Sequence, residues 1–486
     1  MNCTCSAGPE SSPVAEPSLI PDWVPEAVFY QIFPDRFANG NGSNDPANVQ
    51  PWGSPPTIWG FQGGDLEGIL QRLDYLADLG INALYLNPIF QATSNHRYNT
   101  SDYYRIDSKL GTLEDLRRLL KRAHRVGMRV VLDGVFNHCG RGFFAFNDLL
   151  DNQEHSPYRD WFHVKSFPVR AYGTGKLESY LGWWDHKELP KFNTANPEVR
   201  RYLLGVARHW IEQGADGWRL DVPNEIDDDD FWAEFRQTVK QANPEAYLVG
   251  EIWHPDPRWV GPRHFDGLLH YPFRQAVLDY LRGEETDGGN AFSEKVEGLV
   301  KIYPKGQAAG HYITMGSHDT PRLRTELGGN LAKVRLALLA QFTHPGAPGI
   351  YYGDEIGLEG GKDPGCRGAF PWDKQDWEQE LRQHVQRLIT LRRQLPQLRK
   401  GEIARIALAS PGRAAALAVR LEGASTLAVM LNGARARAAI SLPAAELGWQ
   451  EGQPVREALS GRQFQVEHGQ LALALAGFEG ALLVPA

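Results

Sequence analysis

Four apolar segments of this chain end in side chains that could act together as acid and base catalysts. They close with Asp133 followed by Asn137-His138, with Arg219-Leu-Asp221, with Gly250-Glu251, and with His318-Asp319. Taken singly, a carboxylate at the end of a strand is more often a helix cap or a loop hydrogen-bond acceptor. Several carboxylates that face one pocket would perturb one another's pKa values, and such groups tend to mark a functional site.

Cleavage of a glycosidic bond requires a set of groups like this one. One carboxylate attacks the anomeric carbon, one carboxylic acid protonates the leaving oxygen, and further negative charge stabilises a transition state that resembles an oxocarbenium ion. Arg219 lies two residues before Asp221 and therefore on the same side of a strand, where it could hold that carboxylate ionised. The residues thus favour glycoside cleavage.

The elements that would position these residues alternate between short β-branched or aromatic runs and longer segments with helical periodicity. Apolar spacing and caps indicate helices over 66–79, from Thr112 to Gly127, and from Asn196 to Gly214. The strand-like runs are Val28–Phe33, Ala83–Leu86, Arg129–Val135, Gly217–Asp221, Tyr247–Glu251, Gly267–His270, Tyr312–Ser317 and Gly349–Tyr352. Eight such alternations predict an α/β fold, a (β/α)8 TIM barrel whose catalytic face lies at the carboxyl ends of its strands.

Two segments do not fit the barrel pattern. Residues 138–193, after the third strand, are too long and too aromatic for an ordinary loop, which predicts a small inserted domain B over the catalytic face. Residues 399–486 form short alternating runs broken by Gly, Asn and Pro, which predict a C-terminal antiparallel β-sandwich domain. The catalytic barrel is therefore expected over 27–137 and 194–398, with a disordered tail over residues 1–26.

Composition narrows the class of protein. Of 486 residues, 42% are hydrophobic and the net charge is −8, with no basic stripe that could follow a phosphate backbone, so nucleic acid is not an expected partner. No apolar run approaches the roughly 20 residues of a membrane span, and the first 25 residues do not resemble a signal peptide. Four scattered cysteines do not suggest a disulfide framework. We expect a protein of the cytoplasm that does not bind membranes.

The ordered set D-x-x-x-N-H, G-x-R-x-D, G-E-x-W and H-D resembles the conserved regions of the α-amylase family, glycoside hydrolase family 13. The resemblance extends from about Ala27 through the C-terminal β domain. It implies that Asp221 is the nucleophile, Glu251 the general acid/base and Asp319 the transition-state stabiliser. It also implies that three further side chains bind the sugar at the cleaved position, namely Tyr98, His138 and His318.

Other segments are similar to one subfamily, the neopullulanases, cyclomaltodextrinases and maltogenic amylases. Leu189-Pro-Lys-Phe-Asn193 is similar to its M-P-K-L-N segment, and Val222-Pro-Asn224-Glu225 to its V-A-N-E. The departures at Leu189, Phe192 and Pro223 leave the choice of substrate open. The segment Asp363-Pro-Gly-Cys-Arg367 resembles a loop that clamps the sugar one subsite further along. Trp253 is expected to form an aromatic platform on the leaving-group side, or else to pack at a strand end.

A polar segment near the N-terminus could hold a calcium ion. Asn39-Gly-Asn41-Gly-Ser-Asn44-Asp45, with Gly63-Gly-Asp65, offers the oxygen ligands that Ca²⁺ accepts, although turn-forming residues would also explain it without a metal. The resemblance implies structural calcium in this loop, held by Asn39, Asn41, Asn44, Asp45, Gly63 and Asp65.

Three functions stay open at this point. The first is hydrolysis, with retention, of α-1,4 bonds in cyclodextrins, maltooligosaccharides, pullulan or starch, with cleavage of α-1,6 bonds left open. The second is a dedicated transglycosylase or another α-glucosidase-type member, which would use the same covalent intermediate. The third, a non-catalytic sugar-binding scaffold, is disfavoured by the intact Asp221, Glu251 and Asp319. Because many relatives dimerise through an N-terminal β domain and this barrel begins near residue 27, we expect a monomer.

Overall fold

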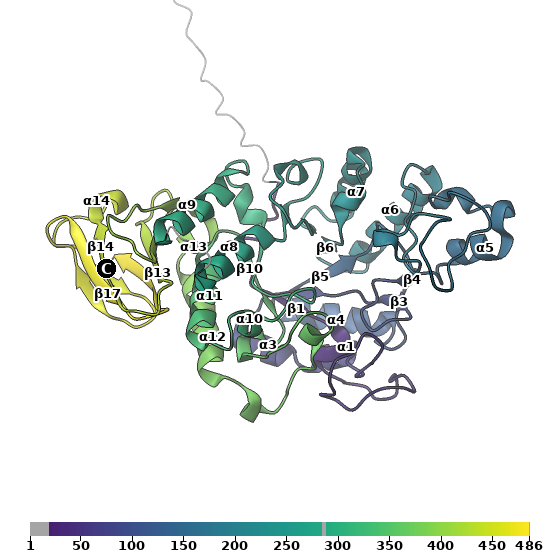
Figure 1. Ribbon diagram of the computed structural model, residues 1–486, viewed down its shortest axis with the longest axis horizontal. Helices are drawn as coiled ribbons and strands as arrows, with labels where there is room; N and C mark the ends of the chain where they lie inside the picture. Colours follow the sequence, from purple (N-terminus) through teal and green to yellow (C-terminus); the bar gives the residue numbers. More distant parts are fainter. Residues whose placement is uncertain (1–18, 284–287, 486) are drawn as a thin grey trace, which may run out of the picture.

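The computed structural model describes residues 19–283 and 288–485, and Figure 1 shows them as an elongated molecule. The barrel occupies the middle. The C-terminal domain, in yellow, lies at one end of the long axis, and helix α5 (Phe144–Asn152) of domain B lies at the other (Figure 1).

The central sheet has eight parallel strands in the order β8-β7-β6-β5-β2-β1-β10-β9. A parallel bridge between Leu269 and Tyr312 joins its two edges, so the sheet closes as the predicted TIM barrel. The strands are β1 (Phe29–Ile32), β2 (Ala83–Leu86), β5 (Arg129–Gly134), β6 (Gly217–Leu220), β7 (Tyr247–Gly250), β8 (Gly267–Leu268), β9 (Tyr312–Thr314) and β10 (Ala347–Tyr351).

Helices follow most strands. The helices of the barrel are α1 (Pro34–Phe37), α2 (Leu66–Gln71), α3 (Leu73–Leu79), α4 (Leu113–Arg125), α6 (Pro197–Glu212), α7 (Asp229–Ala242), α8 (Tyr271–Arg282), α9 (Gly288–Lys301), α10 (Leu323–Glu326), α11 (Leu331–Thr343), α12 (Gln379–Gln394) and α13 (Gln397–Lys400). Thr112 and Asp115 form the predicted capping box of α4, and the Asn196 side chain caps α6.

Two details differ from the expected alternation. The segment predicted as one helix over 66–79 breaks at Arg72, whose φ of −104° and ψ of 7° end α2 and begin α3. Between β7 and β8 the described chain forms only the 3₁₀ turn Pro257–Trp259 and no α-helix. The periodicity of apolar residues does not detect either departure. It indicates which face of a helix is buried, but not whether the helix is unbroken.

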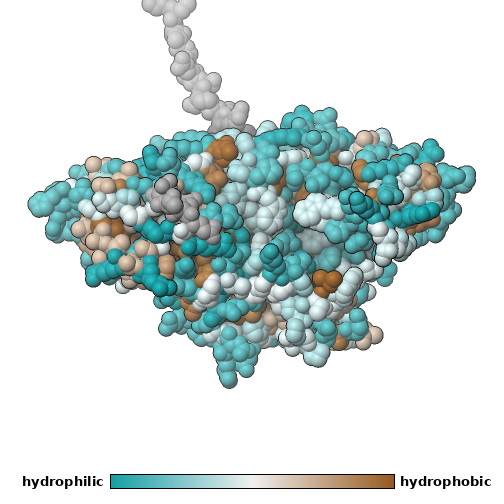
Figure 2. All heavy atoms as spheres, in the orientation of Figure 1, coloured by the Kyte–Doolittle hydropathy of each residue, from teal (hydrophilic) through white to brown (hydrophobic). Residues whose placement is uncertain are grey.

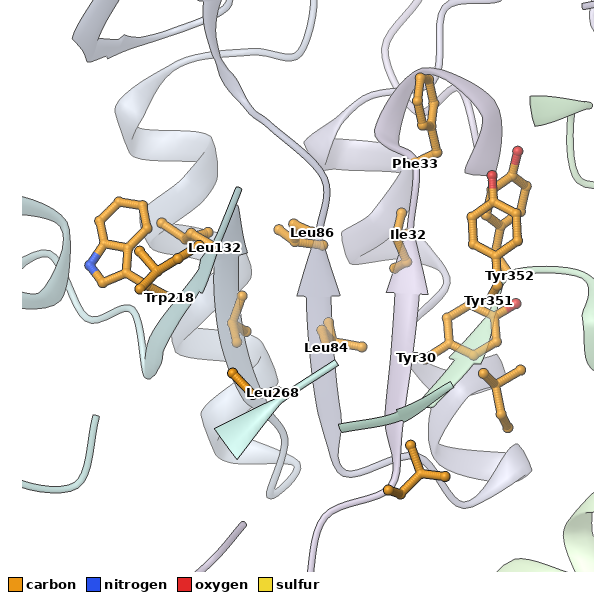
Figure 3. Close-up of a cluster of buried hydrophobic side chains, with 14 of the residues drawn as sticks. Tyr30, Ile32, Phe33, Leu84, Leu86, Leu132, Trp218, Leu268, Tyr351 and Tyr352 are labelled. Atoms are coloured by element: carbon orange, nitrogen blue, oxygen red, sulfur yellow. The ribbon is translucent and has the colours of Figure 1, made fainter. Parts of the chain in front are cut away.

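Side chains alternate between the two sides of the barrel wall. Tyr30 and Ile32 of β1 and Leu84 and Leu86 of β2 belong to the large core shared with the surrounding helices (Figure 3). The alternate residues of the same strands, Phe29, Ala83 and Tyr85, belong to a separate cluster inside the barrel, together with Val131 of β5 and Tyr247 of β7. Polar side chains that point into the barrel near the carboxyl end of each strand therefore reach the catalytic face.

Residues 19–26, the described part of the predicted tail, are folded. Residues 1–18 of the predicted tail lie outside the described residues, but residues 19–26 pack against the barrel, which corrects the prediction of disorder for them. Ile20 and Val24 are buried in the inner cluster with Phe29 and Tyr247, and the indole nitrogen of Trp23 donates to the Glu245 carbonyl at 2.9 Å. These residues cover the end of the barrel opposite the catalytic face.

Domain B contains α5 and short bridges in place of a full sheet. His138 pairs with Lys191, Phe162 with Phe192, and Gly182 with Pro190. A neighbouring hairpin, β3 (Phe90–Ala92) and β4 (Thr100–Ile106), lies between β2 and α4 and was not predicted.

The C-terminal domain is a two-layered antiparallel β structure, as predicted. One sheet has the order β11-β12-β13-β18-β15-β16 and the other pairs β14 with β17, and a separate apolar core lies between them. The elements are β11 (Glu402–Arg405), β12 (Ala414–Arg420), β13 (Leu427–Asn432), β14 (Ala438–Pro443), α14 (Ala444–Leu447), β15 (Pro454–Glu457), β16 (Gln463–Gln465), β17 (Gln470–Leu475) and β18 (Gly480–Pro485).

Polar residues predominate on the face of the molecule shown in Figure 2, and the hydrophobic ones are scattered in small groups. Across 19–283 and 288–485, no helix combines the length and the apolar character needed to pass through a membrane.

Candidate active site

The predicted catalytic carboxyl groups converge on one buried guanidinium, that of Arg219. Its Nη1 lies 2.8 Å from Asp133 Oδ1 and 3.0 Å from Asp221 Oδ1, and its Nη2 lies 2.8 Å from Glu251 Oε1. Arg219 is 1% exposed. The parallel register explains the convergence, because Asp133 pairs with Arg219 across β5 and β6, and Asp221 and Glu251 directly follow β6 and β7.

The charges of this cluster do not balance if every group is ionised. Burial raises the pKa of Asp221 well above its usual value, and Glu251 adds to that effect while Arg219 opposes it. Burial and the nearby Glu251 also raise the pKa of Asp319, although about a third of its side chain (32%) faces solvent. The cluster therefore tends to keep a proton near neutral pH, and acid catalysis needs such a proton.

Backbone strain accompanies this arrangement. Val222, directly after Asp221, has a φ of 36°, in the left-handed region that β-branched residues avoid. Its N–H donates to Glu251 Oε2 at 3.2 Å, so the strained turn places a donor against the second carboxyl group. Strain of this kind costs about 1–3 kcal/mol and persists where the surrounding structure enforces it.

Tyr98 and His318 form a stacked pair beside the carboxyl groups. Their rings are 5.3 Å apart and nearly parallel at 5°, and the Tyr98 hydroxyl lies 2.7 Å from Asp133 Oδ2 and 2.5 Å from His318 Nε2. Gln31 Nε2 donates to His318 Nδ1 at 2.9 Å, which assigns the imidazole proton to Nε2, 3.0 Å from Asp319 Oδ2. Burial holds the pKa of His318 well below its usual value, so this histidine is a neutral donor.

His138 lies at the junction of the barrel and domain B. Its ring stacks on Trp183 at 5.5 Å, and Asn137 Nδ2 lies 3.2 Å from its Nδ1. Its buried Nε2 has no hydrogen-bond partner within the part of the chain that the structure describes. Burial lowers the pKa of His138 to about 3, so a neutral ring nitrogen is free to bind a ligand.

The predicted clamp reaches the same site. Arg367 Nη1 pairs with Asp363 Oδ1 at 3.0 Å, and its Nη2 lies 3.3 Å from Asp319 Oδ1. Its Nε donates to the His318 carbonyl at 2.9 Å. Asp363 and Arg367 are thus joined to Asp319 by one guanidinium.

Three predicted sugar-binding residues lie further out. Trp253 is 49% exposed and stacks on Tyr271 with ring centres 3.8 Å apart and an interplanar angle of 3°, so one face is packed and much of the ring remains accessible. Asn224 and Glu225 lie on the 3₁₀ turn Pro223–Glu225, and Asn224 is exposed. Lys191 of domain B donates to the Glu225 carbonyl at 2.5 Å, which fixes this turn against domain B.

Comparison with known proteins decides the family. A model of the alpha amylase catalytic domain matches residues 31–399. The chain belongs to the α-amylase family. It is a glycoside hydrolase, and its relatives place it in the subfamily of cyclomaltodextrinases, neopullulanases and maltogenic amylases.

Three relatives show how far the similarity extends. The chain is 45% identical to cyclomaltodextrinase of Geobacillus thermopakistaniensis (strain MAS1) over 458 residues, 94% of this chain and 76% of that protein. It is 42% identical to neopullulanase 2 of Thermoactinomyces vulgaris over 465 residues, 95% of this chain and 78% of that one. The solved structure of cyclic alpha-maltosyl-(1→6)-maltose hydrolase from Arthrobacter globiformis superimposes with a TM-score of 0.86 at 39% identity, covering 96% of this chain and 100% of that one.

Several polar residues of this α-amylase-family site were not singled out from the sequence. Gln31 and Asn87 join His318 to Tyr98 through hydrogen bonds of 2.9–3.0 Å, and the Tyr85 hydroxyl donates to Asp133 at 2.6 Å. Gln31 has a detectable signal, because it is a polar residue at an inward position of an otherwise apolar strand. Tyr85 has none, since a tyrosine in a strand is usually ordinary core.

The predicted calcium segment folds into a compact cluster of oxygen atoms. Asn39 Nδ2 donates to both oxygens of Asp45 at 2.9 and 3.0 Å, and Asp65 accepts from Asn44 Nδ2 at 3.0 Å while it caps α2 through the Gly68 N–H. Gly63 approaches so closely that a Cβ there would lie 2.4 Å from Asp45 Oδ1.

These residues fit a calcium ion only in part. The buried Asn44 Oδ1 lacks a hydrogen-bond partner in the described chain, as an unused metal ligand would. Asn41 Oδ1, in contrast, accepts from the Ser43 N–H and hydroxyl at 3.1 and 2.7 Å. Across the described ranges no cluster of three or more acidic, histidine or cysteine side chains could hold a metal, so amide and carbonyl oxygens would have to supply most ligands, as Ca²⁺ allows.

Proposed function

We propose that this glycoside hydrolase cleaves α-1,4-glucosidic bonds with retention of configuration, through a covalent intermediate on Asp221. The observation that carries the proposal is the contact of Asp221 and Glu251 with one guanidinium, at 3.0 and 2.8 Å. A shared guanidinium keeps the two carboxyl groups close, which favours the spacing of about 5–5.5 Å of retaining enzymes over the roughly 6.5–9.5 Å of inverting ones.

In the first step Asp221 attacks the anomeric carbon while Glu251 gives its proton to the leaving glycosidic oxygen. The C–O bond breaks, and a glucosyl ester forms on Asp221. In the second step Glu251 takes a proton from water, and the resulting hydroxide displaces Asp221 at the same carbon. Arg219 favours the ionised form of Asp221 at the start and receives the carboxylate again at the end.

The surrounding residues bind the sugar at the cleaved position. Asp319, whose side chain is partly open to solvent, accepts hydrogen bonds from the sugar hydroxyls and stabilises the positive charge that develops in the transition state. The neutral His138 and His318 donate or accept at other hydroxyls, and Tyr98 stacks beneath the ring. Asp363 and Arg367 bind the next sugar on the non-reducing side, and Asn224, Glu225 and Trp253 line the leaving-group side.

The substrates proposed are cyclodextrins, maltooligosaccharides, pullulan or starch. The relatives named above support this range, since one is a cyclomaltodextrinase and another a neopullulanase. The similarity over the whole length of a cyclic alpha-maltosyl-(1→6)-maltose hydrolase further favours small rings that also contain an α-1,6 bond. A sugar acceptor that replaces water in the second step would give transglycosylation at the same site.

A parallel assay with γ-cyclodextrin, pullulan, soluble starch and sucrose tests the proposal. Rapid ring opening, with maltose or panose among the products, is expected. Activity on sucrose alone would keep the two-step chemistry but refute the substrate class. No activity on any of the four would favour a non-catalytic scaffold.

We also propose a structural calcium ion held by Asn39, Asn44, Asp45, Asp65 and the Gly63 carbonyl, with Asn41 turning away from Ser43 to join them. At a free Ca²⁺ concentration of about 100 times the Kd, binding would stabilise the folded state by about 2.7 kcal/mol. Exhaustive chelation should therefore lower the Tm by several degrees, and added Ca²⁺ should restore it. The Asp45→Asn variant should have a low Tm that chelation does not change. An unchanged wild-type Tm after chelation would contradict the proposal.

We further propose that the protein acts as a monomer in the cytoplasm, and both points stay predictions. Light scattering of the purified protein would detect a dimer and refute the first point.

A further inference from the structure

The loop of residues 51–60, between α1 and α2, carries two exposed apolar side chains near its end. Trp59 is 77% exposed and Ile58 is 48% exposed. Burial of an indole ring gives one of the largest favourable free energies of any side chain, and an exposed tryptophan does not obtain it. A tryptophan beside an isoleucine at the surface therefore suggests a binding site.

The backbone that carries Trp59 is held rigidly. Asn95 Nδ2 donates to the carbonyls of Thr57, Ile58 and Gly60, at 3.1, 3.3 and 2.8 Å. Arg36 Nη2 donates to the same Gly60 carbonyl at 2.7 Å. Asn95 and Arg36 are only 2% and 1% exposed. The backbone of Trp59 is therefore rigid, so less conformational entropy is lost when a ligand packs on its side chain.

The same anchors connect Trp59 to the active site. Arg36 Nη1 donates to the Arg367 carbonyl at 2.7 Å, and the Arg367 side chain pairs with Asp363 and Asp319 at 3.0 and 3.3 Å. One buried guanidinium, that of Arg36, thus holds both the Trp59 loop and the clamp. The backbone beside Trp59 therefore lies next to the segment that carries Asp363 and Arg367.

We propose that Trp59, with Ile58 beside it, is the stacking platform for the third glucosyl unit on the non-reducing side of the cleaved bond. This inference rests on the proposed function, in which Asp363 and Arg367 hold the second unit. One face of a glucosyl ring is lined with C–H groups and packs on an aromatic ring, and an uncharged rim favours such a neutral ligand. The occupant is therefore the continuing α-1,4-glucan chain.

The test compares a short and a long substrate. Maltotriose can be cleaved without a third unit on the non-reducing side, whereas maltohexaose can reach Trp59. In Trp59→Ala the ratio of kcat/KM for maltohexaose to that for maltotriose should fall roughly five- to tenfold, mainly through KM. The first products from maltohexaose should shift from maltotriose towards maltose, and Trp59→Phe should restore most of the ratio.

Tyr104→Ala is the matched control, because Tyr104 is also an exposed aromatic residue (41%) but packs against Tyr202 and His209. Its substrate ratio should equal that of the wild type. An unchanged ratio in folded Trp59→Ala, in an enzyme that cleaves both substrates, would overturn the inference but leave the proposed function intact. A second result would also overturn it: a wild type that is a dimer in light scattering, and a monomeric Trp59→Ala with an unchanged ratio of kcat/KM values. That result would assign Trp59 to the contact with a second copy of the chain. A wild type inactive on both substrates would refute the proposed function itself.

Discussion

At the scale of single residues, one arginine organises the candidate site. Arg219 contacts Asp133, Asp221 and Glu251, and it is the only cation within 4 Å of these three carboxyl groups among the ion pairs of the described residues. An acid and a nucleophile of the same chemical type can take different roles when their surroundings separate their protonation states. Val222 donates to Glu251 and not to Asp221, so the two carboxyl groups differ in their hydrogen-bond partners.

Substitution of Glu251 tests this division of roles. Glu251→Gln should lower kcat/KM on maltooligosaccharides by about 10²–10⁴-fold, because the leaving oxygen loses its proton donor. A substrate with an acidic leaving group, such as 4-nitrophenyl α-maltoside, needs no such donor, so its first step should be much less affected and a burst of nitrophenol should appear. Asp221→Asn should abolish the nitrophenol burst and should lose activity on both substrates. Equal losses on both substrates in Glu251→Gln would argue against Glu251 as the acid.

At the scale of elements, three buried histidines meet where the ends of β8, β9 and α11 pack together. His270 lies 5.2 Å from His311 and 5.4 Å from His344, ring centre to ring centre, and no described residue pairs with the Nε2 atoms. Burial lowers the pKa of His311 to about 3 and of His344 to about 4, and that of His270 well below its usual value. The Arg392 guanidinium, which donates to the His344 carbonyl, disfavours a further positive charge there.

This cluster predicts loss of stability in mild acid. The unfolded chain binds these protons below about pH 6.5, and the folded chain does not, so stability is complete above pH 6.5 and falls as the pH drops towards 4. Each histidine should cost up to about 1.4 kcal/mol for each pH unit below 6.5. Tm measured from pH 7.5 to 4.5 should fall less steeply in His270→Gln than in the wild type, whereas exposed His155→Gln should keep the wild-type slope. Parallel curves for all three proteins would refute the prediction.

At the scale of the whole molecule, the C-terminal domain is part of the main core. Leu417 of β12, Val429 of β13 and Leu482 of β18 belong to the same buried cluster as the barrel helices. Asn290 of α9 exchanges two hydrogen bonds with Leu408, at 2.9 and 3.1 Å. The barrel therefore depends on this domain to cover one of its outer faces, as the contact in Figure 1 between the yellow sheet and the green helices indicates.

Removal of the C-terminal domain should therefore damage the barrel. A chain that ends at Lys400 exposes the apolar side chains that the domain covers, at a cost of about 1.5–3 kcal/mol for each large one. We expect this chain to aggregate or to unfold at a much lower Tm than the full protein, as judged by gel filtration and thermal scanning. A monomeric truncated protein with the Tm and the activity of the full chain would contradict this view.

The amino-acid sequence was sufficient to predict the barrel, the C-terminal β domain and the identities of the residues that converge. It could do so because strand and helix periodicity are local, and because the carboxyl ends of parallel strands must meet at one face whatever the loops do. Asp221, Glu251 and Arg219 could thus be placed together before any contact was known.

The contacts between these groups, and the residues around them, depend on how distant segments pack together. Arg219 pairs with Asp133 as well as with Asp221 because the register of β5 against β6 sets their side chains face to face, and spacing along one strand does not report register. Gln31 of β1 holds His318, and Asn87, directly after β2, accepts a hydrogen bond from Gln31, although both residues are far from His318 in sequence. The break at Arg72, the packing of residues 19–26 and the anchoring of Trp59 by Asn95 and Arg36 also depend on contacts between distant segments, and sequence periodicity carries no information about those.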